Sequence, residues 1–394
     1  MEGELKISHV SFSSSGGAGD VARILAAEQA KLGHNVSFHH VTDSNLALHP
    51  FRNPKLTMAA AVDQYFVKKA RFDPMFSFLR AKAQVLSLDS DYEVLHLHWI
   101  PGALSLNGLS ELAKKSERIF LTAHDLRPAT GGCHYSLSCE GFKSGCSRCP
   151  AVMKPFVGSV RRVAIKQKTT FHDNGVKLIL PSEWMAKMCR QSWITGGLES
   201  KVIENPIGPC FFQLPRHKTA PPSTLRVGIV AANLVDPIKG IVPFLDELLR
   251  KIDKESNITV RLIGSNGKAL GNSDPRITWL GFHAGEDLIR QIDQLDCLVI
   301  PSVAEAAGNV IAEASARGVP SLGVSGSGIS DMISNKNNGY KFESLVDLVL
   351  FVLRSDAAGQ VRALAARSAA EAQRWNPSIA ARRHLDYYSF DKPS

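Results

Sequence analysis

The chain has 394 residues, which is long for a single hydrophobic core and predicts two domains. Its apolar content of 44% is ordinary for a soluble globular protein, and no apolar run reaches the roughly 18 residues of a membrane-spanning helix. The acidic start Met1-Glu2-Gly3-Glu4 lacks the basic and apolar regions of a secretory signal, so we expect a cytoplasmic protein.

The net charge of +9 is unevenly distributed. Residues 1–205 hold 25 Lys and Arg against 18 Asp and Glu, whereas residues 206–394 hold 21 against 19. This surplus is compatible with peripheral contact at the inner face of a membrane through a basic N-terminal domain, and also with ordinary solvated helix faces. No nucleic-acid-binding motif accompanies the charge, so we expect no nucleic acid partner. Much of the surplus is carried by Lys68, Lys69, Arg71, Arg80, Lys82, Lys114, Lys115, Arg161, Arg162, Lys166 and Lys168.

Strands and helices alternate along the first half. Residues 5–12 predict a strand, residues 13–19 a glycine-rich turn, and residues 20–32 a helix that stops at Gly33. The order of these elements predicts a parallel, doubly wound sheet. The further predicted elements are a basic amphipathic helix over 59–88 and strands over 36–41, 94–97, 119–122 and 177–180.

The second half repeats this pattern after a proline-rich stretch. Four prolines between residues 208 and 223 predict a linker, and a strand then starts at Leu225. The elements expected after the strand 225–231 are helix 240–253, strands 259–263 and 277–280, helix 285–295, strand 297–300, helix 307–317 and a helical tail. We therefore predict a Rossmann-like domain over 1–207, a linker over 208–222, a second Rossmann-like domain over 223–375, and a tail over 376–394 returning to the first domain.

The segment around Glu305 and Glu313 is the strongest indication of a binding site. An apolar strand ends in Pro301-Ser302, a carboxylate follows, and a helix-like segment after Gly308 carries a second carboxylate. Open α/β sheets bind ligands at the carboxyl ends of their strands, and helix N-termini attract phosphate. Carboxylates accept hydrogen bonds, which suits sugar hydroxyls. The segment therefore predicts a ligand with phosphate and sugar parts.

Six motifs, in this order, resemble the retaining glycosyltransferases of family 4, which have two Rossmann-like domains (the GT-B fold). They are Ser15-Gly16-Gly17-Ala18-Gly19, Thr122-Ala123-His124-Asp125, Glu204-Asn205-Pro206-Ile207, Asp236-Pro237-Ile238-Lys239-Gly240, the Glu305 to Glu313 pair, and Gly326-Ser327-Gly328-Ile329-Ser330-Asp331-Met332-Ile333. The segment 131–150 further resembles a subgroup that builds bacterial exopolysaccharide and O-antigen, including colanic acid.

This resemblance implies an α/β, GT-B enzyme whose C-terminal helix crosses the domain junction. It would move a sugar from a UDP- or GDP-sugar donor to a growing glycan or polyprenyl-diphosphate-linked acceptor, with retention of configuration. Two alternatives stay open: a non-catalytic two-domain protein that binds nucleotide sugars, and a GT-B epimerase acting on the nucleotide sugar itself. The family's chemistry requires no cofactor, and no Asp-x-Asp motif for a metal is present.

The resemblance also assigns roles in the second domain. Glu305 would contact hydroxyls of the donor sugar, Glu313 the nucleotide ribose, and the backbone amides near Gly308, Asn309 and Val310 the diphosphate. A loop glutamate exposed to solvent and an ordinary helical glutamate are the alternatives for the two acidic residues.

The remaining implied site residues lie in both domains. Lys239 would stabilise the leaving diphosphate, and Asn233 stands roughly where the family often has an arginine. Gly16 and Gly17 would approach the donor phosphate and the acceptor, and His124 would lie beside the reacting sugar, donating to a hydroxyl. A surface lysine and a plain tight turn are the alternatives. His96 and His98, by contrast, are expected to be buried, satisfied histidines.

Four of the seven cysteines fall within seventeen residues: Cys133, Cys139, Cys146 and Cys149. The last two have C-x-x-C spacing, and four thiolates can close a tetrahedral structural zinc site without leaving a position for catalysis. Reduced packing cysteines and disulfides are the alternatives. The loop that carries them is expected to shape the acceptor entrance.

Overall fold

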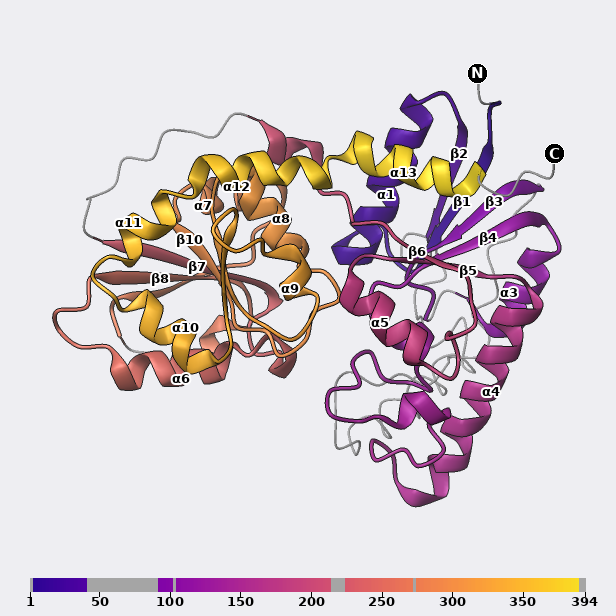
Figure 1. Ribbon diagram of the computed structural model, residues 1–394, viewed down its shortest axis with the longest axis horizontal. Helices are drawn as coiled ribbons and strands as arrows, with labels where there is room; N and C mark the ends of the chain where they lie inside the picture. Colours follow the sequence, from indigo (N-terminus) through magenta and orange to yellow (C-terminus); the bar gives the residue numbers. More distant parts are fainter. Residues whose placement is uncertain (1–2, 41–90, 102–103, 214–223, 272–273, 390–394) are drawn as a thin grey trace, which may run out of the picture. The chain divides into compact units, whose positions relative to one another are not determined.

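The computed structural model describes residues 3–40, 91–101, 104–213, 224–271 and 274–389. They belong to two compact units, one formed by Met1–Pro206 and Pro377–Ser394 and the other by Ile207–Asn376 (Figure 1). The predicted helix over 59–88 and the basic residues from Lys68 to Lys82 lie outside the described residues. Among the described residues, no helix is both long and apolar enough to cross a membrane.

The first unit is built on a parallel six-stranded sheet with the order β2-β1-β3-β4-β5-β6. Its strands are β1 (Lys6–Ser11), β2 (Asn35–His40), β3 (Tyr92–Leu97), β4 (Ser116–Thr122), β5 (Lys177–Leu180) and β6 (Ser200–Val202). Its helices are α1 (Gly16–Lys31), α3 (Leu106–Ala113), α4 (Val157–Asp173), α5 (Glu183–Gln191) and α13 (Pro377–Ser389), with short 3-10 turns η1 (Arg127–Ala129), η2 (Gly141–Ser144) and η3 (Lys154–Phe156).

The C-terminal helix α13 completes the core of the first unit. Its residues Leu385 and Tyr388 pack against apolar strand residues such as Ile7 and Phe120. Ala380, one turn earlier, packs against α1. The sheet of the first unit is therefore covered by segments from both ends of the sequence.

The second unit also has a parallel six-stranded sheet, with the order β12-β11-β10-β7-β8-β9. Its strands are β7 (Leu225–Asn233), β8 (Ile258–Ser265), β9 (Ile277–Gly281), β10 (Cys297–Ile300), β11 (Ser321–Val324) and β12 (Gly339–Phe342). Numbered from β7, this is the order 3-2-1-4-5-6 of the classic dinucleotide-binding sheet. Its helices and turns are η4 (Pro209–Phe212), η5 (Pro237–Lys239), α6 (Ile241–Lys251), η6 (Gly267–Leu270), α7 (Gly285–Ile292), α8 (Asn309–Ala316), α9 (Ile329–Met332), α10 (Leu345–Val352), α11 (Ala357–Arg362), α12 (Ala365–Glu371) and η7 (Ala372–Trp375).

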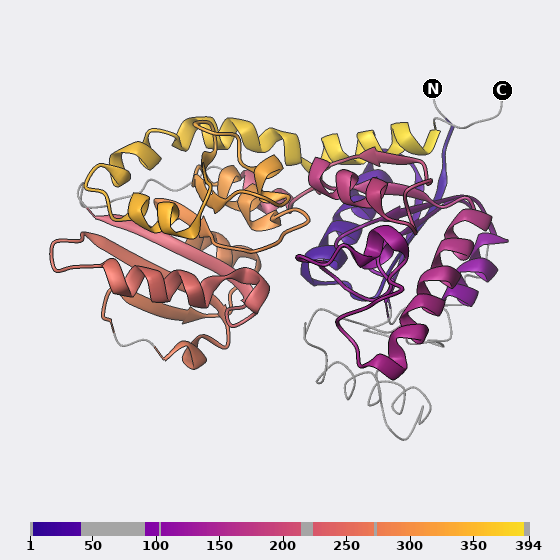
Figure 2. The ribbon, with the colours of Figure 1, turned by 60° about the horizontal axis from the view of Figure 1, so that its bottom comes forward.

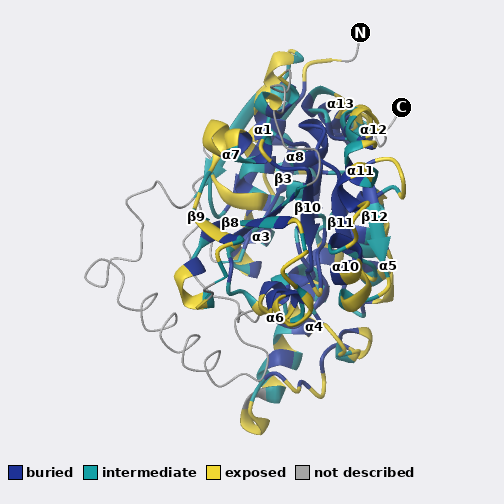
Figure 3. Ribbon diagram, turned by 90° about the vertical axis from the view of Figure 1, so that its left-hand side faces the viewer, coloured by how far each residue is buried: buried dark blue, intermediate teal, exposed yellow. Residues whose placement is uncertain are grey.

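Separate apolar clusters lie on the two faces of this second sheet. On one face, Phe244 and Leu248 of α6 pack with the strand residues Val227 and Val260 and with α10. On the other, α7, α8 and α9 pack against a second set of strand residues, including Ile300. The helices therefore cover both faces, as Figure 2 shows. Burial follows the same layers, with buried strands inside and exposed outer faces on helices such as α6 (Figure 3).

The structure corrects several sequence-based expectations. Helix α1 begins at Gly16, not at Asp20, because the glycines form its first turn instead of a separate turn. Phe211 of the expected linker is buried in the core of the second unit, and Ile207, expected to end the first domain, belongs to that core as well. Prolines end regular helices but do not prevent the side chains between them from packing. The helices α3, α4 and α5 and the strands β6, β11 and β12 were not predicted.

Candidate functional site

The expected site residues gather where the strand order of each sheet reverses. In the first sheet this point lies between β1 and β3, and in the second between β7 and β10. Such a switch point leaves a crevice outside the carboxyl ends of the strands, where open α/β sheets bind ligands.

In the second unit, the structure brings Lys239 and Glu305 together. The ammonium Nζ of Lys239, in η5, donates to Oε1 of Glu305 at 2.6 Å. The hydroxyl of Ser302 donates to the same carboxylate oxygen at 3.1 Å. Glu305 is buried and Lys239 half-buried, so this ion pair is partly removed from water. Burial alone would lower the pKa of Lys239, but the nearby Glu305 carboxylate raises it, so the ammonium stays charged.

Backbone contacts fix this pair from both sides. The amide of Val303 donates to the carbonyl of Ile238 at 2.8 Å, which ties the loop after β10 to η5. Gly328, in the glycine-rich motif before α9, donates its amide to the carbonyl of Glu305 at 2.8 Å. A Cβ at Gly328 would lie 2.2 Å from the carbonyl oxygen of Ala306, so only glycine fits there. The glycine-rich motif thus positions the Glu305 loop.

Helix α8 starts immediately after this loop. Gly308 is its N-terminal flanking residue, and Asn309 and Val310 form its first turn, where backbone N–H groups lack intrahelical acceptors. Glu313 lies four residues after Asn309, on the same face of the helix. A helix N-terminus favours anionic groups and a carboxylate accepts from hydroxyls, so this arrangement is compatible with the diphosphate and ribose contacts expected from the sequence.

Asn233 lies at the carboxyl end of one of the two strands that flank the switch point of the second sheet. It ends β7, and its side-chain oxygen accepts hydrogen bonds from Nδ2 of Asn266 at 2.9 Å and from the amide of Val235 at 3.3 Å. These bonds join the loops after β7 and β8. The hydrogen bonds of Asn233 therefore hold its side chain at this edge of the sheet.

In the first unit, Gly16 and Gly17 begin α1 at the carboxyl end of β1. Gly16 has φ 77°, and a Cβ on either glycine would meet no atom within 4 Å. Both are exposed. Gly19 is different, because a Cβ there would lie 2.4 Å from the carbonyl oxygen of Ser13. Gly16 and Gly17 leave open space at the helix start, whereas Gly19 allows the turn to pack.

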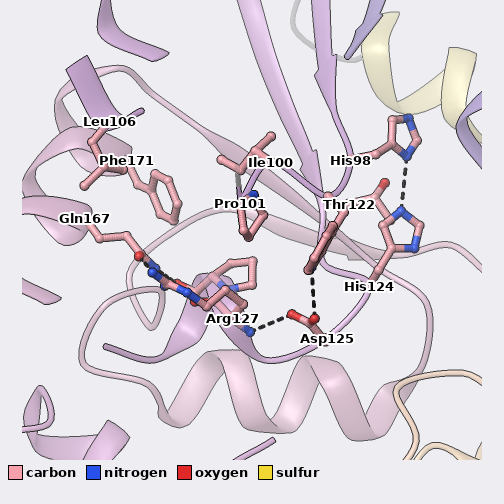
Figure 4. A pocket seen from close by; sticks show the side chains of 12 residues that line it. His98, Ile100, Pro101, Leu106, Thr122, His124, Asp125, Arg127, Gln167 and Phe171 are labelled. Carbon is pink, nitrogen blue, oxygen red and sulfur yellow. Dashed lines mark hydrogen bonds between the residues drawn. The ribbon is translucent and has the colours of Figure 1, made fainter. Parts of the chain in front are cut away.

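His124 lies directly after β4 and lines a pocket beside His98 and Asp125 (Figure 4). Asp125 accepts hydrogen bonds from the indole of Trp99 at 3.1 Å and from Nδ1 of His134 at 2.7 Å. Burial would raise the pKa of Asp125, but the His134 ring and these hydrogen bonds lower it, so the carboxylate is ionised. The sequence pattern indicated His124 but not Asp125, because the partners of Asp125, Trp99 and His134, lie outside its own motif.

His124 is also the last member of a buried chain of hydrogen bonds. Oε1 of Gln29 lies 2.7 Å from Nε2 of His9, whose Nδ1 lies 3.0 Å from Nε2 of His98. Nδ1 of His98 lies 3.2 Å from Nε2 of His124. An amide oxygen only accepts, so each neutral ring in turn must donate through Nε2 and accept through Nδ1. His124 therefore carries its proton on Nε2, and Nδ1 is its acceptor nitrogen.

A second branch runs from Gln29 to the C-terminal helix. Nε2 of Gln29 donates to the hydroxyl of Tyr388 at 3.5 Å, and that hydroxyl bonds Nδ1 of His96 at 2.6 Å. Nε2 of His96 then donates to the hydroxyl of Thr122 at 2.7 Å. His96 and His98 are fully buried and bonded, as expected for satisfied core histidines.

Burial lowers the pKa of every histidine in this cluster. It brings the pKa of His9 and that of His124 to about 4, and lowers those of His96 and His98 as well. The rings are therefore neutral near pH 7. Among the described residues, His9, His96 and His98 alone offer three possible metal-ligand atoms within 4.8 Å of one another. Both nitrogens of each of these rings already have hydrogen-bond partners, so the cluster is better explained as a hydrogen-bond network than as a metal site.

The four clustered cysteines lie together in the loop between β4 and α4. They are free thiols that line one small cavity, and this loop also carries His134. Of the basic residues noted in the sequence, Arg161 and Lys168 on α4 each lie 4.2 Å from the ring centre of Trp193. Part of the basic surplus is therefore used in packing.

Comparisons with known proteins agree with this architecture. Residues 225–354 match the family model described as Glycosyl transferases group 1. No curated protein matches the chain in sequence.

Solved structures resemble the chain over nearly its full length. The structural match to sucrose-phosphate synthase from Thermosynechococcus elongatus spans 98% of this chain and 98% of that protein's chain, with a TM-score of 0.66 and 15% sequence identity. The match to HepE of Anabaena, solved with UDP and glucose, spans 98% of this chain and 100% of the HepE chain, with a TM-score of 0.58 and 17% sequence identity. The match to a glycosyltransferase from Rickettsia africae spans 98% of this chain and 98% of that protein's chain, with a TM-score of 0.59 and 15% sequence identity. The chain therefore has the GT-B fold, and its second Rossmann-like unit contains a segment that matches the glycosyl transferases group 1 model.

Proposed function

We propose that the protein is a retaining glycosyltransferase that moves a sugar from a nucleotide-sugar donor to a growing glycan or lipid-linked acceptor in surface polysaccharide synthesis. The observation that supports this best is the Lys239–Glu305 ion pair at the carboxyl end of β10, beside the first turn of α8. Both residues lie within the segment that matches the glycosyltransferase family model.

The chemistry of the pair fits the cleavage of a sugar–phosphate bond. Negative charge grows on the phosphate oxygen as the bond breaks, and a fixed ammonium stabilises that charge more in the transition state than in the ground state. Because Glu305 raises the pKa of Lys239, the lysine serves as a permanent cation and not as a proton donor. Glu305 keeps a second oxygen with which to accept from a sugar hydroxyl.

His124 would contact the sugar as an acceptor. The hydrogen-bond chain from Gln29 fixes its proton on Nε2, so its Nδ1 can receive a proton from a hydroxyl in a hydrogen bond. The family resemblance suggested the other role for His124, donation to a sugar hydroxyl. Its low pKa keeps the ring neutral at physiological pH, as such a contact requires.

The donor we propose is a UDP-sugar, because HepE of Anabaena, similar in fold, was solved with UDP and glucose. The acceptor we propose is anionic and lipid-linked, in keeping with the exposed Arg162 and Lys166 on α4 and with a location at the inner face of a membrane. No metal is needed for the transfer, since Lys239 and the α8 amides would neutralise the diphosphate.

The proposal is tested with the full chain, a panel of nucleotide sugars and a mixture of glycan acceptors, with the release of nucleotide and the products both measured. Glu305→Gln should lower the transfer rate by about 10²–10³, as loss of one contact in a preorganised site does. The matched control is Glu286→Gln on α7, whose side chain is exposed. Equal rates for wild type and Glu305→Gln would refute the assignment.

The same assay separates the alternative functions. A binding protein would be stabilised by UDP but would release none from UDP-sugars. An epimerase would convert the donor without any acceptor. At 100 times its dissociation constant, a bound nucleotide adds about 2.7 kcal/mol of stability, which thermal unfolding with UDP, GDP, ADP and CMP detects.

A further inference from the structure

The loop between β4 and α4 is long and almost without regular structure. Residues 123–156 contain only the short turns η1, η2 and η3. Loops longer than about 15 residues without secondary structure are uncommon in compact domains. In the cysteine-bearing part of the loop, Phe142, Cys146, Cys149 and Ala151 form a small buried cluster with Val160 of α4. Because two of these five residues are cysteines, apolar burial in this cluster gives the cysteine-bearing part of the loop little support.

Four cysteines from three parts of the loop surround a single cavity. Cys133, Cys139, Cys146 and Cys149 all line it, and the residues that complete its wall include no carboxylate and no imidazole. All four are free thiols. A set of four sulfur ligands without oxygen or nitrogen selects soft or borderline ions such as zinc over magnesium or calcium.

The backbone directs N–H groups at three of the sulfurs. Gly141 donates to Cys139 Sγ at 3.4 Å, and Gly131 donates to Cys146 Sγ at 3.3 Å. Cys149 accepts from the amides two and three residues further along the chain. A neutral thiol is a weak acceptor, whereas hydrogen bonds to an ionised acceptor are about twice as strong. This arrangement therefore suits thiolates.

Positive charge also lies close to the sulfurs. Arg161 donates to the carbonyls of Ser144 and Gly145 at 3.1 and 3.0 Å, directly before Cys146. Burial has the largest effect on the pKa of the Cys146 thiol and raises it, whereas the positive charges of Arg127 and Arg161 lower it. Four thiolates around a divalent cation carry a formal charge of −2, which these two guanidinium groups would offset.

The chain bends sharply where the C-x-x-C pair begins. Gly145 has φ 75° and Cys146 has φ 56°, a left-handed conformation that costs a non-glycine residue about 1 kcal/mol or more. Such strain persists where the surroundings fix it. The sulfurs do not stand at ligand spacing, since among the described residues no three of them lie within 4.8 Å of one another. Bonds of about 2.3 Å to a tetrahedral ion would hold them about 3.8 Å apart, so binding requires side-chain rotation toward the cavity.

We propose that Cys133, Cys139, Cys146 and Cys149 bind one structural zinc ion that holds the 123–156 loop together. The ion would fix Cys133 and with it the adjacent His134, which bonds Asp125 beside His124. The site goes beyond the proposed transfer reaction, because the four ligands leave no position on the ion for a substrate.

The test is metal analysis of the full chain purified under reducing conditions without chelator. We expect about one zinc per chain, retained on dialysis and lost from Cys149→Ser. The control is Cys210→Ser, which changes a half-buried cysteine of the second unit and should keep the zinc. Cobalt added to reduced, zinc-free chain should give the intense visible bands of a tetrahedral, sulfur-rich site.

Three results would overturn the proposal, and none depends on glycosyl transfer. The first is reduced wild-type chain that holds no stoichiometric zinc and gives no tetrahedral cobalt spectrum. The second is thiol labelling that shows disulfides among the four cysteines in freshly purified protein. The third is zinc content in Cys149→Ser equal to that in Cys210→Ser. The cobalt measurement uses the wild-type chain, so it tests the zinc site even if the Cys149→Ser variant folds poorly.

Discussion

Acid should destabilise the first unit through its buried histidines, and His9 provides a quantitative test. Its side chain is fully buried, and burial, partly offset by the hydrogen bond to Gln29, lowers its pKa from 6.5 to about 4. The unfolded chain binds a proton at His9 as the pH falls below 6.5, whereas the folded chain resists protonation down to about pH 4. Stability from His9 is therefore fully present above pH 6.5 and is lost between pH 6.5 and 4.

The size of the effect follows from this shift. A difference of 2.5 pKa units corresponds to about 3 kcal/mol, lost at about 1.4 kcal/mol per pH unit. At pH 5.5, unfolding should add about 0.9 protons at His9, because the unfolded side chain is mostly protonated and the folded one is not. The buried carboxylate of Asp296 does not titrate in this pH window, since its pKa is lowered to about 2 and the stability that it contributes is lost below pH 4.

Calorimetry of the full chain at pH 5.5, in buffers with different ionisation enthalpies, counts the protons taken up on unfolding. The variant His9→Gln keeps a neutral hydrogen-bonding side chain and should take up about one proton fewer than wild type. The matched control is His283→Gln, at a half-buried position of the second unit. It tests whether replacing any histidine lowers the number of protons taken up on unfolding. Equal proton uptake by wild type and His9→Gln would show that His9 is not held neutral by burial.

Two further predictions concern stability in the second unit. Gly240→Ala should lower the free energy of unfolding by several kcal/mol, because Gly240 has φ 61° and a Cβ there would lie 2.1 Å from a backbone carbonyl oxygen. The control Gly271→Ala, with φ 62° and open space around the Cβ, should lower it by only about 1–2 kcal/mol. Equal urea midpoints for the two variants would contradict this prediction. Asp296→Asn should cost about 3–5 kcal/mol, because Asp296 is buried and accepts from both Arg226 and Arg362 at 2.9–3.0 Å. An unchanged melting temperature would show that the two arginines find other partners.

The sequence alone determined the class of fold and indicated where the candidate site lies. Short apolar strand patterns that alternate with helical patterns predicted parallel sheets. Most described strands lie within two residues of their predicted bounds, as for β5 and β10. The Glu305 segment was recognisable because its strand, loop and helix are contiguous, so local pattern carried the information. Short or amphipathic elements such as β6 and α5 were missed, since their apolar positions are too few to give a clear period.

Only the tertiary structure decided which side chains meet. The pairing of Lys239 with Glu305 joins positions 66 residues apart, and that of Tyr388 with His96 joins positions 292 apart. The proton position on His124 depends on Gln29, His9 and His98, which come from separate elements. Each hydrogen bond has a direction that depends on its neighbour, so it becomes defined only when the chain has folded and the groups share one buried space.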